Sequence, residues 1–235
     1  MARNLIAQDD ARENRLVDIF NLVRPARRVR HGVDAVLVVD GQEIEFELKS
    51  VTTARGSIST VRDLGRDHIE KWANKHWIVA FFDGTDPLRC RYGSPTAVAP
   101  WIDRIWDYIK RDFELAELAP GELSIETMFS ILGRKDHYTA LDARKLHKMQ
   151  YSAAKYKELM DMDGGYSPER MLEIFRARLK YVIERGSTLN NPHINPSDYL
   201  AWPEISRDYA VTLRRLVTEW IHATPARPIA PADRP

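Results

Sequence analysis

Three charged residues, Asp34, Glu47 and Lys49, have the types and the spacing to carry out hydrolytic chemistry together. Asp34 opens an apolar segment, and thirteen positions later Glu47 and Lys49 flank Leu48 in a segment where charged and apolar residues alternate. Two carboxylates held close together repel each other, and a divalent cation removes that repulsion. A lysine beside them would hold a phosphate, or would orient an attacking water and help to deprotonate it.

A β-hairpin is the element expected to bring these residues together. The segment VDAVLVV is rich in β-branched residues, the Asp-Gly dipeptide at 40 and 41 is typical of a two-residue turn, and EIEFELKS alternates polar with apolar residues. Counting back from such a turn sets Asp34 opposite Glu47. The three charged side chains are therefore expected to converge on one patch.

Magnesium is the cation that fits these groups. Mg²⁺ takes oxygen ligands in octahedral geometry and usually keeps several waters. The carboxylates of Asp34 and Glu47, the carbonyl of Leu48 and a phosphate oxygen would suit it, and Mn²⁺ is expected to substitute for it.

An ordinary solvated strand face is the alternative interpretation. Glu43, Glu45, Glu47 and Lys49 all lie on one side of the second strand, where they would form ion pairs in solvent. The context favours the catalytic interpretation, because an acid just after Gly32, a tight hairpin, a crossover and a hydroxyl-rich loop occur together.

The elements around the hairpin follow from periodicity. A first helix is expected over residues 9–23, and Pro25 ends it. After the hairpin, a helix over 61–75 and an apolar strand over 76–84 form a right-handed crossover, which sets this strand parallel to the second hairpin strand. An edge strand is expected over 88–94. Further helices are expected over residues 101–118, 124–132, 139–162, 168–185 and 206–222.

These elements indicate an α/β (α+β) fold, with a central mixed β-sheet flanked by helices and a mostly helical C-terminal half. The expected organisation is a core over residues 1–100, a helical elaboration over 101–223 that packs with the core, and a disordered tail over 224–235. The chain of 235 residues can bury a sizeable core. Four tryptophans are expected in that core: Trp72, Trp77, Trp101 and Trp106.

A soluble cytoplasmic protein is expected from the composition. The single cysteine, Cys90, excludes an internal disulfide, and no apolar run is long enough to span a bilayer. Zinc-binding Cys/His spacing, Walker loops and dinucleotide fingerprints do not occur in the sequence.

Two polar segments are candidates for contact with nucleic acid. The loop after Lys49 carries hydroxyl and guanidinium groups, which bind phosphate oxygens. These residues are Ser50, Thr52, Arg55, Ser57, Ser59, Thr60 and Arg62. An Asn- and Pro-rich segment carries donors and acceptors that match base edges. Its candidates are Asn190, Asn191, His193 and Asn195. Plain loops and turns are the alternative for both segments.

Net charge excludes a generally basic nucleic-acid coat protein, because it is only +1. Local basic surfaces remain compatible with that value. RPARRVRH at residues 24–31 contains no acid. A second basic group could follow a phosphate backbone or form a solvated helix face: Arg134, Lys135, Arg144, Lys145 and Lys148.

The spacing of the charged residues resembles the PD-(D/E)xK nuclease motif. Asp34 matches its first acid, Glu47-Leu48-Lys49 matches its E-x-K, and Val33 replaces its proline. The order helix, hairpin, helix, strand is similar to the core of that superfamily, and the resemblance covers about the first hundred residues. It implies that Asp34 and Glu47 bind the metal and that Lys49 assists the water.

Glu13 is a further candidate. Similar enzymes often bring an acid from the N-terminal helix into the metal site, and Glu13 lies on the helix expected here. A surface position is the alternative.

The resemblance and the chain length imply a type II restriction endonuclease. The expected reaction is Mg²⁺-dependent, sequence-specific hydrolysis of double-stranded DNA that leaves 5′-phosphates. The resemblance also implies a homodimer acting on a palindrome and a companion DNA methyltransferase, although a monomer that cuts each strand in turn is an alternative. Two other functions stay open: a structure-specific DNA repair or recombination nuclease, and a non-enzymatic DNA-binding protein.

Overall fold

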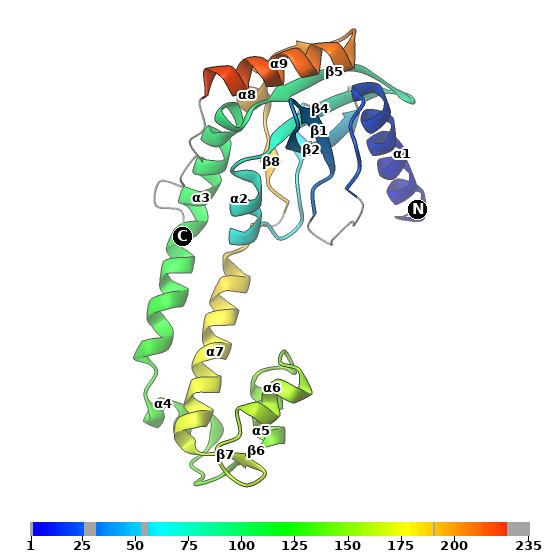
Figure 1. Cartoon of the computed structure of the whole chain (residues 1–235). Helices are drawn as coiled ribbons and strands as arrows, with labels where there is room; N and C mark the ends of the chain where they lie inside the picture. Colours follow the sequence, from blue (N-terminus) through cyan, green and yellow to red (C-terminus); the bar gives the residue numbers. More distant parts are fainter. Residues whose placement is uncertain (1, 26–31, 53–55, 190, 225–235) are drawn as a thin grey trace. The chain divides into compact units, whose positions relative to one another are not determined.

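The computed structural model describes residues 2–25, 32–52, 56–189 and 191–224. The chain divides into two compact units: the sheet unit, residues 1–106 and 189–235, and the helical unit, residues 107–188. Figure 1 labels their elements. In chain order these are α1 (Ala2–Phe20), β1 (Ala35–Val39), β2 (Gln42–Thr52), β3 (Ile58–Ser59), α2 (Arg66–Trp72), β4 (His76–Asp83), β5 (Asp86–Gly93), α3 (Pro95–Leu118), η1 (Ala119–Glu122), α4 (Ile125–Leu132), β6 (Tyr138–Thr139), α5 (Ala140–Leu146), α6 (Ala153–Glu158), β7 (Gly165–Tyr166), α7 (Pro168–Ser187), β8 (His193–Ile194), α8 (Pro196–Tyr199), β9 (Glu204–Ile205) and α9 (Tyr209–Ala223).

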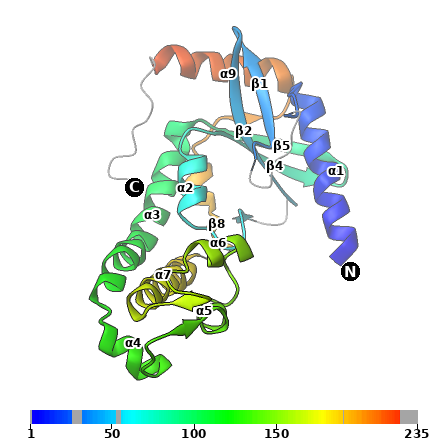
Figure 2. The same ribbon diagram turned by 60° about the horizontal axis from the view of Figure 1, so that its bottom comes forward.

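A five-stranded mixed sheet with the order β1-β2-β4-β5-β9 forms the centre of the sheet unit. β1 and β2 are antiparallel, with Val39 paired to Gln42 and Ala35 paired to Phe46, which is the expected hairpin register. β2 and β4 run parallel, as expected for the crossover through α2. The expected mixed sheet flanked by helices is therefore confirmed (Figure 2).

The turn of the hairpin has the backbone geometry that its sequence favours. Asp40 and Gly41 have φ angles of +49° and +79°. Two consecutive positive φ angles are typical of the type I′ turn, whose twist matches that of the strands it joins. The local sequence thus favours the observed register.

Both faces of β4 are buried. Ile78, Ala80 and Phe82 pack in the apolar core that α1 and α9 cover. On the other face, Trp77 contacts Trp72 of α2 and Trp101 of α3, with ring centroids 5.0 and 5.8 Å away. The four tryptophans expected in the core are all buried there, none more than 7% exposed.

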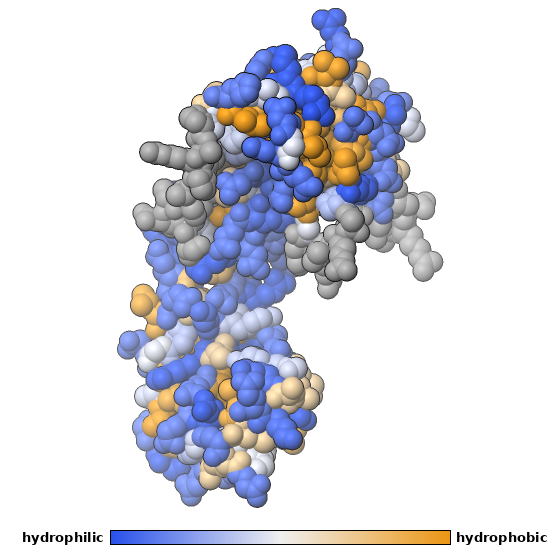
Figure 3. Space-filling view, viewed as in Figure 1, coloured by the Kyte–Doolittle hydropathy of each residue, from blue (hydrophilic) through white to orange (hydrophobic). Residues whose placement is uncertain are grey.

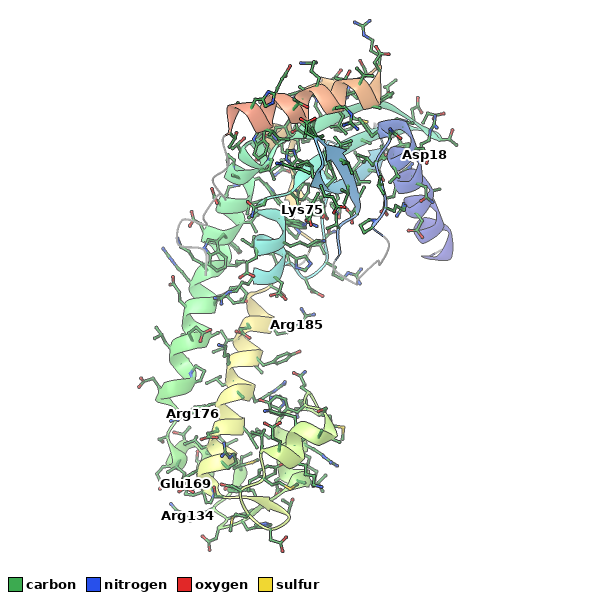
Figure 4. The ribbon with its side chains drawn as sticks, viewed as in Figure 1. Asp18, Lys75, Arg134, Glu169, Arg176 and Arg185 are labelled. Atoms are coloured by element: carbon green, nitrogen blue, oxygen red, sulfur yellow. The ribbon has the colours of Figure 1, made fainter. Side chains whose placement is uncertain are left out.

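The helical unit has a small core of its own. Tyr138, Tyr156 and Met171 are among its buried residues, and β6 pairs with β7 beside them. Arg176 of α7, which Figure 4 labels, donates hydrogen bonds to the carbonyls of Leu123 and Gly121 and so ties α7 to the chain that precedes α4.

The helix expected over 139–162 is wrong, because α5 and α6 are separate. Lys148 and Met149 have φ angles of +53° and +58°, which end the first helix. Ser152 then starts the second helix by accepting a hydrogen bond from the backbone N–H of Lys155. The first helix also ends earlier than expected, at Phe20, and the crossover helix begins later, at Arg66.

The strand expected at the sheet edge is interior. β5 pairs with β4 on one side and with β9 on the other, because Glu204 and Ile205 return to the sheet. The Asn- and Pro-rich segment forms β8 and α8 within its described residues, and β9 follows it directly.

The division of the chain differs from the expected boundary after residue 100. Residues 189–224 belong to the sheet unit, through β8, β9 and α9, and not to a helical elaboration. The tail expected to be disordered falls outside the described residues from 225 onward, and so does the basic segment from 26 to 31.

The surfaces of the two units differ in polarity. In the view of Figure 3, hydrophobic residues gather over the sheet unit between α9 and α1, and hydrophilic residues cover much of the helical unit. Within the described part of the chain, every helix is too short or too polar to cross a bilayer.

Gly165 should be essential to the helical unit. A Cβ at this position would lie 2.4 Å from the carbonyl oxygen of Tyr138, where β7 meets β6. We expect Gly165→Ala to lower the free energy of unfolding by about 1–3 kcal/mol, measured by urea unfolding followed by circular dichroism. Gly186→Ala is the control, because a Cβ on this α7 residue meets nothing within 4 Å. Equal stability of the two variants would contradict the close approach.

Candidate active site

The hairpin brings the first acid to the second strand. Asp34 directly precedes β1, and its Oδ2 accepts a hydrogen bond of 2.9 Å from the backbone N–H of Leu48. Because Ala35 pairs with Phe46, this bond fixes the Asp34 carboxylate beside Glu47. The expected convergence of the two acids is thus present in the structure.

Glu47 is a buried carboxylate between two lysines. It is 3% exposed. Its Oε1 accepts a hydrogen bond of 2.9 Å from Nζ of Lys49, and its Oε2 lies 3.5 Å from Nζ of Lys71. Oε2 makes no hydrogen bond within the described residues. Glu43 and Glu45 are exposed on the same strand, so the solvated strand face ends before Glu47.

Burial and neighbouring charges shift the pKa values of Asp34, Glu47 and Lys49 in different directions. Burial, and then the charge of Glu47, raise the pKa of Asp34. Burial opposes ionisation of Glu47, but the charges of Lys49 and Lys71 outweigh it and hold the pKa of Glu47 below its usual value. Burial likewise opposes the charge on Lys49, and Glu47 and Asp34 outweigh it and raise the pKa of Lys49. Lys49 is therefore an ammonium at neutral pH.

Two lysines that sequence reasoning missed also approach the site. Lys71 lies in the last turn of α2, and Lys75 follows the helix, beside the sheet in Figure 4. Lys75 is 3% exposed, its Nζ has no hydrogen-bond partner in the described residues, and the nearest carboxylate oxygen, of Glu45, is 3.8 Å away. Burial, and then the charge of Lys71, lower the pKa of Lys75. No local pattern signals this approach, because Lys75 lies beyond the end of α2 and the position of Lys71 depends on how α2 packs on the sheet.

A cavity of about 280 Å³ opens beside Lys49. Its lining residues are Glu13, Leu16, Leu48, Lys49, Ser50, Ser59 and Thr60. The N-terminal helix thus brings Glu13 to the cavity where Lys49 lies. Glu13 is also 3.3 Å from Arg24, so its carboxylate already has a cationic neighbour.

The two polar segments form one β-ribbon, although they are far apart in the sequence. β3 and β8 are antiparallel, and Ile58 pairs with Ile194 while Ser59 pairs with His193. Both isoleucines are fully buried, and Ser59 and His193 are exposed. The ribbon therefore presents a polar face to solvent and buries its apolar face.

Hydrogen bonds hold this ribbon at the end where Ser59 and Thr60 meet Asn191 and Pro192, and also tie it to α3. Ser59 Oγ donates to Oδ1 of the exposed Asn191, and Thr60 Oγ1 donates to the carbonyl of Pro192 at 2.6 Å. Trp101 Nε1 donates to the carbonyl of His193 at 3.1 Å, which anchors β8 to α3. The backbone that carries the exposed side chains of the ribbon is thus held in place.

The other candidate residues are more dispersed. Thr52, Ser57 and Arg62 are exposed. Asn195 holds the N-cap position of α8, where its backbone N–H donates to Asp198 at 2.9 Å, so its position has a structural explanation. Arg55 and Asn190 fall outside the described residues.

The donor set is compatible with a hard divalent cation. The carboxylates of Asp34 and Glu47 supply oxygens, and Glu47 Oε2 is buried without a hydrogen bond. Among the described residues, no group of three or more His, Cys, Asp or Glu side chains is arranged to hold a metal. Two carboxylates are nevertheless enough for Mg²⁺, which commonly uses one or two and completes its shell with water.

Comparisons with protein families and with curated proteins find no match: no protein-family model matches the sequence, and no curated protein matches it significantly. The function therefore has to be inferred from the residues of the site.

Replacement of the two acids should change stability in opposite directions when EDTA removes metal. Because the pKa of Asp34 is raised in the folded state, its ionised form destabilises the fold. We expect Asp34→Asn to have a higher Tm than the wild type at pH 8. The difference should vanish as the pH falls below 3.8, the ordinary pKa of this side chain, because Asp34 is then protonated in both the folded and the unfolded state. Thermal melts across this pH range measure it.

Glu47→Gln should instead destabilise the protein by about 3–5 kcal/mol, because it leaves buried lysine charges without their anion. The same melts at pH 8 provide the comparison. Loss of stability in Asp34→Asn, or none in Glu47→Gln, would contradict the charge arrangement.

Proposed function

We propose that this chain is a type II restriction endonuclease of the PD-(D/E)xK superfamily, which hydrolyses double-stranded DNA at specific sequences with Mg²⁺. One observation carries the proposal: the half-buried Asp34 and the buried Glu47 are adjacent carboxylates at a hairpin, with Lys49 hydrogen-bonded to Glu47. A buried carboxylate such as Glu47 is costly, and its neighbours Leu48 and Lys49 line a cavity, which favours a functional role.

The roles of the residues follow from their positions. Asp34, Glu47 and the carbonyl of Leu48 would hold the cation. When bound, Mg²⁺ supplies Lewis-acid stabilisation of the charge that develops on the phosphoryl oxygens and on the leaving 3′ oxygen. Lys49 donates from its ammonium to the attacking water or to a phosphate oxygen, and thereby aligns the water with the scissile bond.

Lys49 is better suited to positioning than to accepting a proton. Its ammonium is stabilised by Glu47 at 2.9 Å and by the charge of Asp34. This refines the expectation that the lysine helps to deprotonate the water: its contribution is charge and orientation, and the product keeps a 5′-phosphate.

Sequence selectivity is assigned to the β3–β8 ribbon. A two-stranded ribbon fits the major groove of B-DNA, where base edges present a distinct pattern of donors and acceptors. Ser59, Asn191 and His193 provide such groups on the solvent-facing side of the ribbon. Ser59 and Thr60 also line the cavity beside Lys49, which supports a link between base reading and cleavage.

Two features favour this function over the alternatives. Burial of Glu47 argues against a non-enzymatic protein in which the acids are only an exposed strand face. The anchored polar ribbon favours a sequence-specific enzyme over a structure-specific repair or recombination nuclease. A homodimer acting on a palindrome, with a companion DNA methyltransferase, remains part of the proposal.

Lys49→Ala and Asp34→Ala should each reduce cleavage by about 10³-fold or more, because several kcal/mol of transition-state stabilisation are lost. Binding to duplex DNA should persist in both variants. The measurement is digestion of unmethylated phage DNA with Mg²⁺ or with EDTA, followed by sequencing of fragment ends.

Lys110→Ala is the control for this digestion, since Lys110 is an exposed α3 residue paired with Asp107 at 2.6 Å. Discrete fragments that require metal, Asp34 and Lys49 are the expected result. Full cleavage by Lys49→Ala would overturn the mechanism.

Metal binding can be tested without activity. Mg²⁺ at a hundredfold excess over its dissociation constant should stabilise the wild type by about 2.7 kcal/mol, seen as a rise in Tm. Asp34→Asn should lose most of this rise, because one of two carboxylate ligands is gone, and Lys110→Ala should keep it. A rise of equal size in Asp34→Asn would place the cation elsewhere.

A further inference from the structure

A cationic surface covers α5 and α6 in the helical unit. From the start of α5 to the end of α6, residues 140–158, the chain carries five basic side chains and two acids, Asp142 and Glu158. The basic residues are Arg144, Lys145, Lys148, Lys155 and Lys157. These two helices follow one another across a short connection (Figure 2). The surface is therefore locally basic although the chain is nearly neutral.

Most of this charge is uncompensated. Asp142 pairs with Lys135 at 3.0 Å, and Lys155 pairs with Glu158 at 2.7 Å. No ion pair joins the other four basic residues of this surface to an acid within the described part of the chain. Arg144 instead lies over the ring of Tyr156, with its guanidinium carbon 5.7 Å from the centroid. A cluster of like charges without ion-pair partners favours the binding of a polyanion.

A pocket with a basic rim lies under this surface. It has a volume of about 430 Å³, and Lys145, Lys148 and Arg178 line it together with apolar side chains. One acid, Asp142, also lines it, and its carboxylate pairs with Lys135. Arg178 Nη1 is buried and has no hydrogen-bond partner in the described residues. A guanidinium with an unused buried donor, next to two lysines, is suited to a phosphate oxygen.

The connection between the helices fixes Lys148. Lys148 and Met149 both have left-handed backbone conformations, which non-glycine residues rarely adopt in succession. The N–H of Met149 donates to the carbonyl of Arg144 at 3.0 Å. The buried His147 stacks on Tyr151, with ring centroids 3.9 Å apart. Lys148 thus lies on an ordered turn.

We propose that the α5–α6 surface of the helical unit binds the phosphate backbone of duplex DNA, with Lys145, Lys148 and Arg178 receiving one phosphate. Arg144 and Lys157 lie outside the pocket, so the basic surface extends beyond what a single free phosphate would need. α6 is only six residues long, and for this reason we assign it backbone contact and no base reading. The choice of duplex DNA as the polyanion rests on the proposed function.

Salt-dependent binding by the full chain tests the proposal. Affinity for a fluorescent DNA duplex would be measured by anisotropy in EDTA at several salt concentrations, for the wild type and for Lys145→Ala/Lys148→Ala/Lys157→Ala. Each phosphate contact removed should lower the slope of log K against log salt by about 0.9, and affinity should fall at every salt concentration. These exposed substitutions leave the core of the unit intact, which a thermal melt would verify.

The matched control is Lys110→Ala/Lys180→Ala. Both lysines lie in the same unit but pair with acids, Lys110 with Asp107 at 2.6 Å and Lys180 with Glu117 at 2.5 Å. This variant should bind DNA like the wild type. An unchanged slope and affinity in the triple variant would overturn the proposal, as would equal losses in both variants.

Further outcomes separate this inference from the nuclease proposal. DNA binding that needs the three lysines, in a protein that never cleaves, would support the inference and overturn the nuclease. Cleavage that is unaffected in the triple variant at every salt concentration would support the nuclease and overturn the inference. Calorimetric binding of inorganic phosphate that is lost in the triple variant, with DNA affinity unchanged, would identify a small-anion site and overturn DNA contact here.

Discussion

The hairpin register is the constraint on which the site depends. Side chains alternate between the two faces of a strand, so a slip of one residue between β1 and β2 would move Glu47 and Lys49 to the opposite face. The Asp-Gly turn and the hydrogen bond from Leu48 N–H to Asp34 Oδ2 hold the register at its two ends. A buried carboxylate is tolerated only where its partners are in place, and this register provides them.

The charge around Glu47 shows how stability and chemistry oppose each other. Lys49 and Lys71 stabilise the ionised Glu47, whereas burial and the charge of Glu47 raise the pKa of the half-buried Asp34 and so disfavour its ionised form. Lys75 adds a buried amino group with no hydrogen bond in the described residues, and burial lowers its pKa. A fold selected only for stability would replace such groups by apolar side chains of similar volume.

Local sequence predicted the parts of the site that depend on local geometry. The Asp-Gly turn and the alternating strand were enough to align Asp34 with Glu47, and the crossover length was enough to make β4 parallel to β2. The approach of Lys71 was not predictable in the same way, because it depends on the rotation of α2 against the sheet. The break between α5 and α6 also escaped prediction, since no glycine or proline marks Lys148 and Met149.

Contacts between segments that are far apart in the sequence could not be predicted from the sequence pattern. Ser59 and Asn191 looked like members of two separate loops, and only the folded chain makes them neighbours on one ribbon. The same is true of β9, because two residues without strand periodicity complete the sheet beside β5. The residues of each segment are compatible with turns. Whether such a segment forms a turn or a strand depends on whether it pairs with another strand in the folded chain.

The sheet unit is assembled from two segments of the chain, with the helical unit inserted between them. β8, β9 and α9 all follow residue 188, so a growing polypeptide cannot complete the ribbon beside Lys49 until the whole helical unit has left the ribosome. Closing contacts over so long an interval makes the last step of folding slow. Under the nuclease function proposed above, this order of synthesis means that only a finished chain could cleave the DNA of its own cell, and that no nascent fragment could.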